Sequence, residues 1–497
     1  MSAGPSRRTV LLSAAFAAVA TPLAAVTAHA AARTPKVLVI GLDGALLGRI
    51  KGASTPHLDA LMAGGVTAGS RIYADPLAPT LSGPGWSTIL TGVWPDKHLV
   101  KDNAFTGHAF ARYPDFLTRV ETAKPALSTY AVSSWAPITD TVFSSAVDTR
   151  VSTPSAEYDT GTTSRAVAEL GGGDRDAVFV HLDNIDHAGH SYGAASSRYL
   201  TAIQTADAQV GQILAAVTGR STYASEDWLI MVTADHGHTD AGGHGGNTDP
   251  ERQTFLIAKG GTITAGTTRY DIKMPDVAAS ALVHLGVTID AAWGLDGRPL
   301  QTPVSDAFDT LRPQLATRVD ETGIAAGVTG FTHTPPAGWS VENAAMGTGG
   351  MTEWRGWSFT TDEFWTAAER GQQRESNIRA RNVFAVADGD EWADRSFTGT
   401  FDSTLVSPAW AVTGGSTAVL RYTTLYRQES PQKGEVSVSW DGGTPVTVKT
   451  YSADTSSRSE AITLQVPAGV RSARIRFRYT GGNNWFWTVD GVSLDVS

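Results

Sequence analysis

Uninterrupted apolar segments, separated by helix-like segments, constrain the fold of this chain most. From Lys36 onward the strand-like segments read KVLVIGL, STYAVSSW, DAVFVHLD and WLIMVTA. The segments between them include TSRAVAELGG and a long helix expected from about Ser197 to Thr218. Strands that are apolar throughout and alternate with helices form a parallel sheet covered on both faces. We therefore expect an α/β domain over residues 36–303, built on a mixed, mostly parallel sheet flanked by helices.

The second half of the chain has a different pattern. Segments such as TAVLRYTTLY, GEVSVSWDGG and SARIRFRYTGG alternate polar and apolar residues and are separated by turn residues. This alternation predicts an all-β sandwich over residues 331–497, joined to the first domain by a linker over 304–330. Nine of the fourteen tryptophans follow residue 330. We expect them to fill the core of the sandwich, and a sugar-binding face is the alternative.

The N-terminal segment has the features of an export signal. Arg7 and Arg8 precede an apolar, alanine-rich run that ends at Ala28-His29-Ala30. The run is too short for a stable membrane span. The arginine pair resembles the twin-arginine signals, so we expect residues 1–30 to be removed and the protein to be secreted without a stable membrane anchor. An anchor formed by the uncleaved segment is the alternative.

Composition excludes several kinds of chemistry. The chain has no cysteine, so disulfides, thiol catalysis and thiolate metal sites are excluded. Its formal net charge is −10, and no run of lysine and arginine provides the positive surface that a polymeric nucleic acid needs. A small anionic substrate would have to be held by bound cations.

Acidic residues and histidines follow three of the predicted strands. They are Asp43 after the first, Asp186 and His190 after DAVFVHLD, and Asp235, His236 and His244 after WLIMVTA. Each one alone would be a helix cap or a surface loop residue. The carboxyl ends of parallel strands meet at one edge of the sheet, where these side chains would repel one another unless cations neutralise them. Six such ligands and one hydroxyl suit two divalent ions about 4 Å apart, and we expect zinc.

Ser82 in PTLSGPGWSTILTG supplies the hydroxyl. Its position before a proline-containing first turn is also that of an ordinary helix cap. Neither a G-x-S-x-G turn nor a Ser/His/Asp arrangement is present to activate it as a nucleophile. A coordinated cation lowers the pKa of a bound oxygen, and the helix N-terminus favours the resulting anion.

These residues resemble the alkaline phosphatase superfamily and, within it, the type I phosphodiesterase/nucleotide pyrophosphatase branch. The resemblance covers about residues 36–303. It rests on three motifs, which are Ser82, Pro84, Thr91-Gly92, Trp94-Pro95, His98 and Asp102-Asn103; Asp186, Gly189, His190 and Gly193; and Asp235, His236 and Gly237.

The resemblance implies a set of site residues. One metal would be held by Asp43, Ser82, Asp235 and His236, and the other by Asp186, His190 and His244. Ser82 would be the nucleophile, and Asn103 would donate a hydrogen bond to a phosphoryl oxygen. His244 lies eight residues after His236, whereas nucleotide pyrophosphatases usually take this ligand from a distant segment. The compact arrangement looks more like the phosphoethanolamine-transferring relatives, and His238 is the competing candidate for the last ligand.

We expect a small phosphate ester as substrate, and a diester rather than a monoester. Lys97 and Lys101 are the nearest cations to Ser82 in the sequence and are expected to face solvent, and Arg71 could fold back into the site. Trp86 is expected to border the second ester group. Phe110, Tyr113, Phe116 and Trp135 could stack a base or fill a core.

Several alternatives remain. A phosphomonoesterase shares the metal ligands, as do phosphoglycerate mutases and phosphonoacetate hydrolases. A sulfatase is disfavoured because Trp86 stands where sulfatases have an arginine. A secreted binding or adhesion protein is the non-enzymatic alternative, in which the β-sandwich would contact a glycan or a cell surface. The loop from Asp388 to Arg395 could hold calcium but lacks EF-hand spacing, so a solvated turn is preferred.

Overall fold

The computed structural model describes residue 1 and residues 33–72 and 77–497. Residues 2–30 of the expected export signal therefore lie outside the described part of the chain. The residues from Thr34 to Ser497 form one compact unit. Among the described residues, no helix has both the length and the apolar character needed to cross a membrane.

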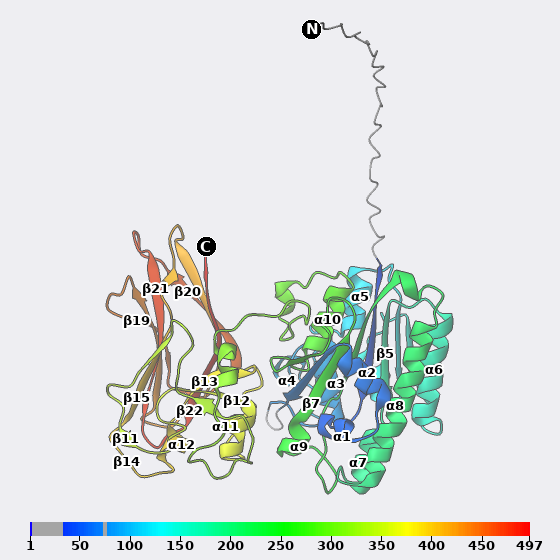
Figure 1. Cartoon of the computed structure of the whole chain (residues 1–497), viewed down its shortest axis with the longest axis horizontal. Coiled ribbons are helices and arrows are strands. Elements are labelled where there is room, and N and C mark those ends of the chain that lie inside the picture. Colours follow the sequence, from blue (N-terminus) through cyan, green and yellow to red (C-terminus); the bar gives the residue numbers. More distant parts are fainter. Residues whose placement is uncertain (2–32, 73–76) are drawn as a thin grey trace. The chain divides into compact units, whose positions relative to one another are not determined.

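The first half of this unit is organised around an eight-stranded sheet (Figure 1). Its strands, in spatial order, are β4 (Thr149–Ser152), β3 (Thr129–Ser133), β5 (Ala177–Leu182), β1 (Thr34–Leu42), β6 (Glu226–Thr233), β7 (Gln253–Lys259), β2 (Val66–Arg71) and β8 (Thr267–Arg269). The strands from β4 to β6 are parallel, whereas β7 runs antiparallel to both β6 and β2. The predicted mixed, mostly parallel sheet is thus confirmed.

Helices cover both faces of this sheet, as alternate residues of β1 require. Val37 and Val39 point into one core, which α3, α5 and α10 complete. Leu38 and Ile40 point into the other, beneath α2, α6 and α8 (Figure 1). The helices of this half are α1 (Leu47–Gly52), α2 (Pro56–Ala63), α3 (Ser82–Thr91), α4 (Pro95–His98), α5 (Phe116–Ala123), α6 (Tyr158–Gly172), α7 (Asn184–Tyr192), α8 (Ser197–Thr218), α9 (Asp249–Arg252) and α10 (Asp276–His284), with short turns η1 (Ile138–Val142), η2 (Tyr223–Ser225) and η3 (Ala291–Trp293).

The strand register determines where the candidate ligands lie. Gly41 of β1 pairs with His181 of β5 on one side and with Thr233 of β6 on the other. The residues that follow these three positions therefore leave the sheet at the same edge. This is the edge at which open α/β sheets bind their ligands.

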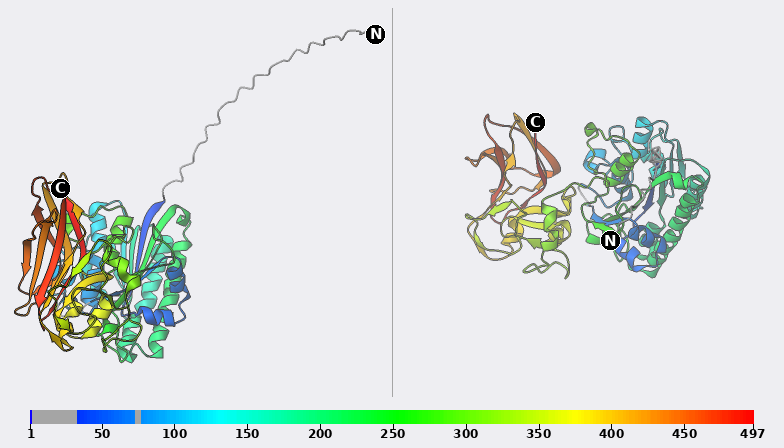
Figure 2. Two further views of the ribbon diagram at one scale, coloured as in Figure 1. Left: turned by 60° about the vertical axis from the view of Figure 1, so that its left-hand side comes forward. Right: turned by 45° about the horizontal axis from the view of Figure 1, so that its top comes forward.

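The second half is all β apart from short helices and turns, as its alternating pattern predicts. One antiparallel sheet has the order β20-β17-β22-β13-β12-β9, and the other has the order β10-β15-β21-β18-β19, with β16 beside β21. The strands of this half are coloured from yellow-green to red in Figure 2. The elements are η4 (Phe308–Gln314), β9 (Phe331–Thr332), β10 (Ser340–Glu342), β11 (Thr348–Gly349), β12 (Ser358–Thr361), α11 (Asp362–Ala368), η5 (Arg374–Ser376), β13 (Val383–Asp388), α12 (Gly389–Ala393), β14 (Phe397–Thr398), β15 (Phe401–Val406), β16 (Trp410–Ala411), β17 (Thr417–Tyr426), β18 (Lys433–Trp440), β19 (Val446–Tyr451), β20 (Thr455–Gln465), β21 (Ser472–Gly481) and β22 (Phe486–Val496).

All nine C-terminal tryptophans belong to the core of this half or pack against it. Trp354, Trp357, Trp365, Trp392 and Trp487 are fully buried. The core interpretation is therefore confirmed, and these rings do not form an exposed sugar-binding row. The stretch over 304–330, expected as a linker, contributes Phe308, Leu311 and Ile324 to the same core.

The loop expected to be a solvated turn is instead a short capped helix. Asp388 ends β13, and its side chain accepts a hydrogen bond from the Glu391 amide, which begins α12. Oxygens of Glu369, Asp390 and Glu391 lie within 4.8 Å of one another. The fully buried guanidinium of Arg374 bonds Asp388, Asp390 and Glu391 at about 3 Å, and so already supplies a positive charge there. The calcium site stays a prediction.

Candidate metal centre and nucleophile

Two carboxylates and an imidazole form the most deeply buried part of the site. Ligand atoms of Asp43, Asp235 and His236 lie within 4.8 Å of one another, and all three side chains are inaccessible to solvent. Asp43 follows β1, and Asp235 and His236 follow β6. Asp43 Oδ1 and Asp235 Oδ2 are buried without a hydrogen-bond partner among the described residues. Buried carboxylate oxygens are normally hydrogen-bonded, so these two fit the requirements of a bound cation.

The other oxygen of Asp43 is held by two donors. Its Oδ2 accepts hydrogen bonds from Trp86 Nε1 at 2.8 Å and from His181 Nε2 at 2.9 Å. This fixes the carboxylate with Oδ1 free, the arrangement that orients metal ligands in proteins. Trp86 is fully buried, so the expectation that it borders the second ester group is wrong, because its ring packs beneath the site against His181.

A second group of ligands lies beside the first. Atoms of Asp186, His236, His238 and His244 fall within 4.8 Å of one another. His190 lies at their margin, its Nε2 2.9 Å from His244 Nε2 and 3.4 Å from Asp186 Oδ2. The structure thus brings together every predicted metal ligand, and it adds His238.

His238 lies as close to Asp186 as the predicted ligands do. Its Nε2 is 2.6 Å from Asp186 Oδ1, while its buried Nδ1 has no partner among the described residues. An added Cβ at Gly44 or Gly189 would come within 2.8 Å or 2.6 Å of the His238 ring, so only glycine fits beside it. His190 Nε2 and His244 Nε2 also lie 3.4 Å from oxygens of Asp186, so this contact alone does not distinguish a ligand. His190 and His244 remain the predicted ligands, and His238 remains the alternative to His244.

Without bound cations, the charges of the buried carboxylates in these two groups of residues destabilise one another. Burial, together with the charges of Asp235 and Asp186, raises the pKa of Asp43 well above its usual value. Burial and the charge of Asp186 likewise raise the pKa of Asp235. Burial lowers the pKa of His236 and of His244, so neither imidazole supplies a compensating positive charge. Buried carboxylates held this close need a cation to remain ionised.

Ser82 lies at the first residue of α3, facing these ligands. The helix cap position belongs to Leu81, and the helix start has no side-chain capping bond. Ser82 Oγ is instead 3.4 Å from His236 Nε2, and the residue is 8 % exposed. The interpretation of Ser82 as a helix cap is therefore wrong, and its hydroxyl lies where it can share a cation with His236.

Gly83 and Gly85, on either side of Pro84, allow the first turn of α3 to lie close to Asp235 and Asp102. A Cβ at Gly85 would lie 2.8 Å from the Cβ of Asp235, and one at Gly83 would lie 2.6 Å from the Asp102 carbonyl oxygen. Real Cβ atoms do not come this close, so the first turn of α3 reaches the metal ligands only with glycine at both positions.

Asn103 is held by the same turn. The Gly83 amide donates to Asn103 Oδ1 at 2.8 Å. With its oxygen engaged, the side chain has its Nδ2 hydrogens available as donors beside Ser82. The role expected for Asn103 stays a prediction.

Asp183 and Tyr158 are members of this neighbourhood that sequence reasoning missed. Oxygens of Asp183 lie with Asp43 and His181 in a further group within 4.8 Å. Burial raises the pKa of Asp183 to about 7, and the Tyr158 hydroxyl donates to its Oδ2. Tyr158 has a φ of 47°, which is rare for a residue with a side chain. Asp183 and His181 both stand in the strand segment DAVFVHLD, whose apolar pattern indicates a buried strand and gives no sign of a site.

Two of the three cations considered for a place beside Ser82 are engaged elsewhere. Lys97 Nζ bonds Asp296 at 2.7 Å, and Arg71 Nε bonds Asp249 at 2.8 Å. Lys101 is exposed. Of the aromatic residues expected to stack a base or fill a core, Phe110 and Phe116 are buried in the α/β core, while Trp135 packs at its border.

The first half of the chain is similar to known proteins. Residues 37–142 and 122–249 match the family "Type I phosphodiesterase / nucleotide pyrophosphatase". The chain is 28 % identical over 185 residues to GPI ethanolamine phosphate transferase 2 of Aspergillus fumigatus, covering 36 % of this chain and 24 % of that protein. It is 37 % identical over 87 residues to GPI ethanolamine phosphate transferase 1 of Chaetomium globosum, covering 18 % and 9 %. The chain thus spans no more than about a quarter of the length of these two relatives.

Solved structures are similar at low identity. Murine ectonucleotide pyrophosphatase/phosphodiesterase 5 is 15 % identical, with a TM-score of 0.41 and coverage of 51 % of this chain and 95 % of that one. The phosphonate monoester hydrolase of Agrobacterium radiobacter is 16 % identical, with a TM-score of 0.40 and coverage of 54 % and 76 %. Likenesses this distant do not bear on function.

Proposed function

We propose a function for this chain on the premise that residues 37–249 belong to the type I phosphodiesterase/nucleotide pyrophosphatase family of the alkaline phosphatase superfamily. We infer that the chain is a metal-dependent enzyme that cleaves phosphate diesters, with Ser82 as nucleophile. The observation that carries this proposal is the pair of buried, unpartnered oxygens, Asp43 Oδ1 and Asp235 Oδ2, beside His236 and the Ser82 hydroxyl.

The residues divide into two metal sites. Asp43, Asp235 and His236, with Ser82, would hold one divalent cation. Asp186, His190 and His244 would hold the other. When bound, such cations lower the pKa of a coordinated hydroxyl and neutralise charge on the phosphoryl group. The absence of cysteine and the His/Asp ligand set favour zinc.

The chain's own groups then perform the displacement. Ser82 Oγ loses its proton and attacks phosphorus, so that a P–O bond to serine forms and the bond to the leaving oxygen breaks. The leaving oxygen takes up a proton and departs as an alcohol. Asn103 donates from Nδ2 to a non-bridging oxygen, on which charge develops. Trp86 and His181 hold Asp43, and His238 holds Asp186. The bond between serine and phosphorus must then be broken by water or by an acceptor alcohol.

The charge around Ser82 favours a diester over a monoester. A monoester carries a second negative charge on the transferred group, and many monoesterases meet it with an additional arginine or metal. Here Arg71 and Lys97 are bound to Asp249 and Asp296. Asn103, a neutral donor, is the group that the structure offers beside the nucleophile.

Transfer to an alcohol is the second candidate reaction. The curated relatives are ethanolamine phosphate transferases, and His244 follows His236 closely in the sequence, as in phosphoethanolamine-transferring proteins. Both reactions use the same serine intermediate and differ only in the acceptor. Secretion, and contact of the β half with a glycan or cell surface, remain part of the proposal.

The test is a comparison of specificity constants on one purified sample. We expect bis(p-nitrophenyl) phosphate to be preferred over p-nitrophenyl phosphate, and Ser82→Ala to lose at least about a thousandfold in kcat. Ser87→Ala is the matched control. Ser87 lies on the same buried helix, and its hydroxyl donates only to the Gly83 carbonyl among the described residues. We expect its kcat to stay within a few-fold of wild type. A tenfold preference for the monoester would reverse the substrate assignment, and an active Ser82→Ala variant would overturn the mechanism. Adding ethanolamine or glycerol as acceptor separates transfer from hydrolysis by the products formed.

A further inference from the structure

A cavity of about 420 Å³ opens beside strands β2, β7 and β8. It shares no lining residue with the metal ligands or with Ser82. Its wall is formed by Ser70 and Arg71 of β2, by residues of α1, β7 and β8, and by the segments around Lys273, Arg312 and Asp362. Nothing in the proposed reaction uses this cavity.

The charges on its wall do not balance. Lys51, Arg71, Lys273 and Arg312 face two carboxylates, Asp362 and Glu363. Both carboxylates already have arginine partners, since Asp362 bonds Arg252 at 3.0 Å and Glu363 lies 3.4 Å from Arg71. The lysines and Arg312 are therefore left with an excess of positive charge.

Lys273 is the most unusual of these cations. The residue is only 6 % exposed, and its Nζ has neither a hydrogen bond nor an ion pair among the described residues. Burial lowers the pKa of its ammonium to about 8, against the opposing charge of Asp362, so the group remains a cation at neutral pH. The side chain is thus mostly buried, and its ammonium has no anionic partner among the described residues, so an anion bound in the cavity would gain a favourable charge interaction with it.

Two further donors line the same wall. Ser70 Oγ is buried and has no hydrogen-bond partner among the described residues. The Arg312 guanidinium lies 3.4 Å from the centre of the Tyr270 ring and donates to Asn382 Oδ1 at 2.7 Å, which fixes its position. The cavity thus combines an unpartnered ammonium, an unpartnered hydroxyl and an oriented guanidinium.

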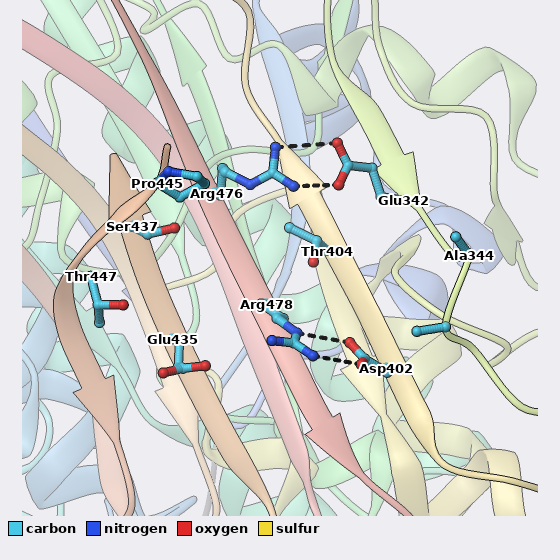
Figure 3. A pocket seen from close by; sticks show the side chains of 11 residues that line it. Glu342, Ala344, Asp402, Thr404, Glu435, Ser437, Pro445, Thr447, Arg476 and Arg478 are labelled. Carbon is cyan, nitrogen blue, oxygen red and sulfur yellow. Dashed lines mark hydrogen bonds and ion pairs between the residues drawn. The ribbon is translucent and has the colours of Figure 1, made fainter. Parts of the chain in front are cut away.

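A second cavity, on the face of the β half, differs in that its arginines are paired with carboxylates. It has a volume of about 380 Å³ and is also lined by arginines (Figure 3). There, however, Arg476 is paired with Glu342, and Arg478 donates to both oxygens of Asp402, at 2.9 and 2.7 Å (Figure 3). Its charges are satisfied within the protein, and they do not require a ligand.

We propose that the cavity beside β2, β7 and β8, named here the Lys273 pocket, binds a phosphate group. Lys273 Nζ donates a hydrogen bond to its oxygens, and Ser70 Oγ donates a second one after its side chain turns from the buried rotamer toward the cavity. Lys51 and Arg312 supply further positive charge. The phosphate group belongs either to free inorganic phosphate or to a larger phosphorylated ligand, since both present the same oxygens. The proposal does not depend on the metal centre or on the reaction assigned to it.

The test measures phosphate binding by the full, metal-loaded chain. Equilibrium dialysis against radiolabelled inorganic phosphate gives the number of phosphates bound per chain. We expect Lys273→Met to bind one fewer than wild type while turning over bis(p-nitrophenyl) phosphate at the wild-type rate. Lys259→Met, an exposed lysine at the end of β7 outside the pocket, should bind the wild-type number. Lys273→Arg keeps the charge and should retain the site.

A second variant covers the case in which Lys273→Met does not fold. Ser70→Ala removes one neutral hydrogen bond and should weaken phosphate binding at this site by about threefold to tenfold. If phenyl phosphate displaces the radiolabelled phosphate at a lower concentration than unlabelled inorganic phosphate does, the pocket prefers a larger phosphorylated ligand. If it needs an equal or higher concentration, the pocket prefers free phosphate. If folded Lys273→Met and Ser70→Ala both bind phosphate as wild type does, the proposal is overturned.

Discussion

His181 Nε2 lies 2.9 Å from Asp43 Oδ2, and both side chains are inaccessible to solvent. Burial lowers the pKa of His181 to about 3, so the imidazole is neutral and donates its Nε2 hydrogen to the carboxylate. This bond, with that from Trp86, leaves Oδ1 as the free oxygen of Asp43. In the proposed metal centre, His181 would therefore act through Asp43 rather than as a ligand.

The first prediction concerns His181. Replacing a group that orients a metal ligand typically costs about tenfold to a hundredfold in metal affinity or activity. We expect His181→Ala to lose metal in this range while activity returns at high metal concentration, measured by titrating zinc into chelator-treated protein. His284→Ala, a part-buried histidine that bonds the Asp227 carbonyl, is the matched control. Unchanged zinc affinity in His181→Ala would contradict the role.

The second prediction separates His190 from His238. If His190 is a ligand, His190→Ala should hold about one zinc per chain instead of two, measured by elemental analysis at saturating metal. His238→Ala should still reach two, but with weaker affinity, because it removes only the bond to Asp186 Oδ1. The opposite pattern would make His238 the ligand and His190 a surface residue.

Removal of metal should lower stability as well as activity. Without cations, Asp43 and Asp235 must be protonated or repel Asp186, since burial and these charges raise their pKa values. A ligand at a thousand times its Kd stabilises the folded state by about 4 kcal/mol. Chelation should therefore abolish activity and lower the melting temperature, and zinc should restore both. An unchanged melting temperature and full activity after verified metal removal would rule out a metal centre.

His98 should make the protein sensitive to acid. Burial lowers the pKa of His98 from 6.5 to about 3, although Asp296 acts in the other direction. Between these two values the unfolded chain binds a proton that the folded chain does not. His98 therefore leaves the free energy of unfolding unchanged above pH 6.5 and lowers it as the pH falls toward 3. The loss is about 3 kcal/mol at pH 4. His98→Gln should show a shallower fall in urea stability over this range, and parallel curves would contradict the assignment.

Arg374 should be essential to the β half. Its buried guanidinium pairs with Asp388 and Glu391. Removing one partner from a buried ion pair typically costs about 3 to 5 kcal/mol, because the carboxylates remain buried. Arg374→Met should lower the free energy of unfolding in urea by this amount. Arg395→Met, whose exposed side chain pairs with Asp320, should change it by less than about 1 kcal/mol, and equal effects would contradict the distinction.

The sequence was informative where apolar pattern and motif coincide. The parallel strands, the long helix over Ser197–Thr218 and the β half are visible in hydrophobic periodicity. Each predicted metal ligand lies near the others, because parallel strands place their carboxyl ends together.

Other features depend on contacts that periodicity does not encode. Strand β2, with the sequence VTAGSR, carries little apolar signal, and it is held by antiparallel pairing with β7. Trp86 looked like a substrate contact because it follows Ser82 closely, and only packing shows that it bonds Asp43. His181 occupies an apolar strand, where a histidine is normally a core residue. Its partner lies 138 positions away in the chain.

Three of the candidate metal ligands lie close together in the sequence, in the segment that joins β6 to β7. Asp235, His236 and His244 all lie between β6 and β7, which are adjacent antiparallel strands. The entropy lost on closing a loop grows with the logarithm of its length. A ligand eight residues from His236 therefore costs about 2 kcal/mol less to bring into place than one roughly a hundred residues away. If the proposed ligands are correct, this segment could bind a cation as soon as its two strands pair, and part of each metal site would be in place early in folding.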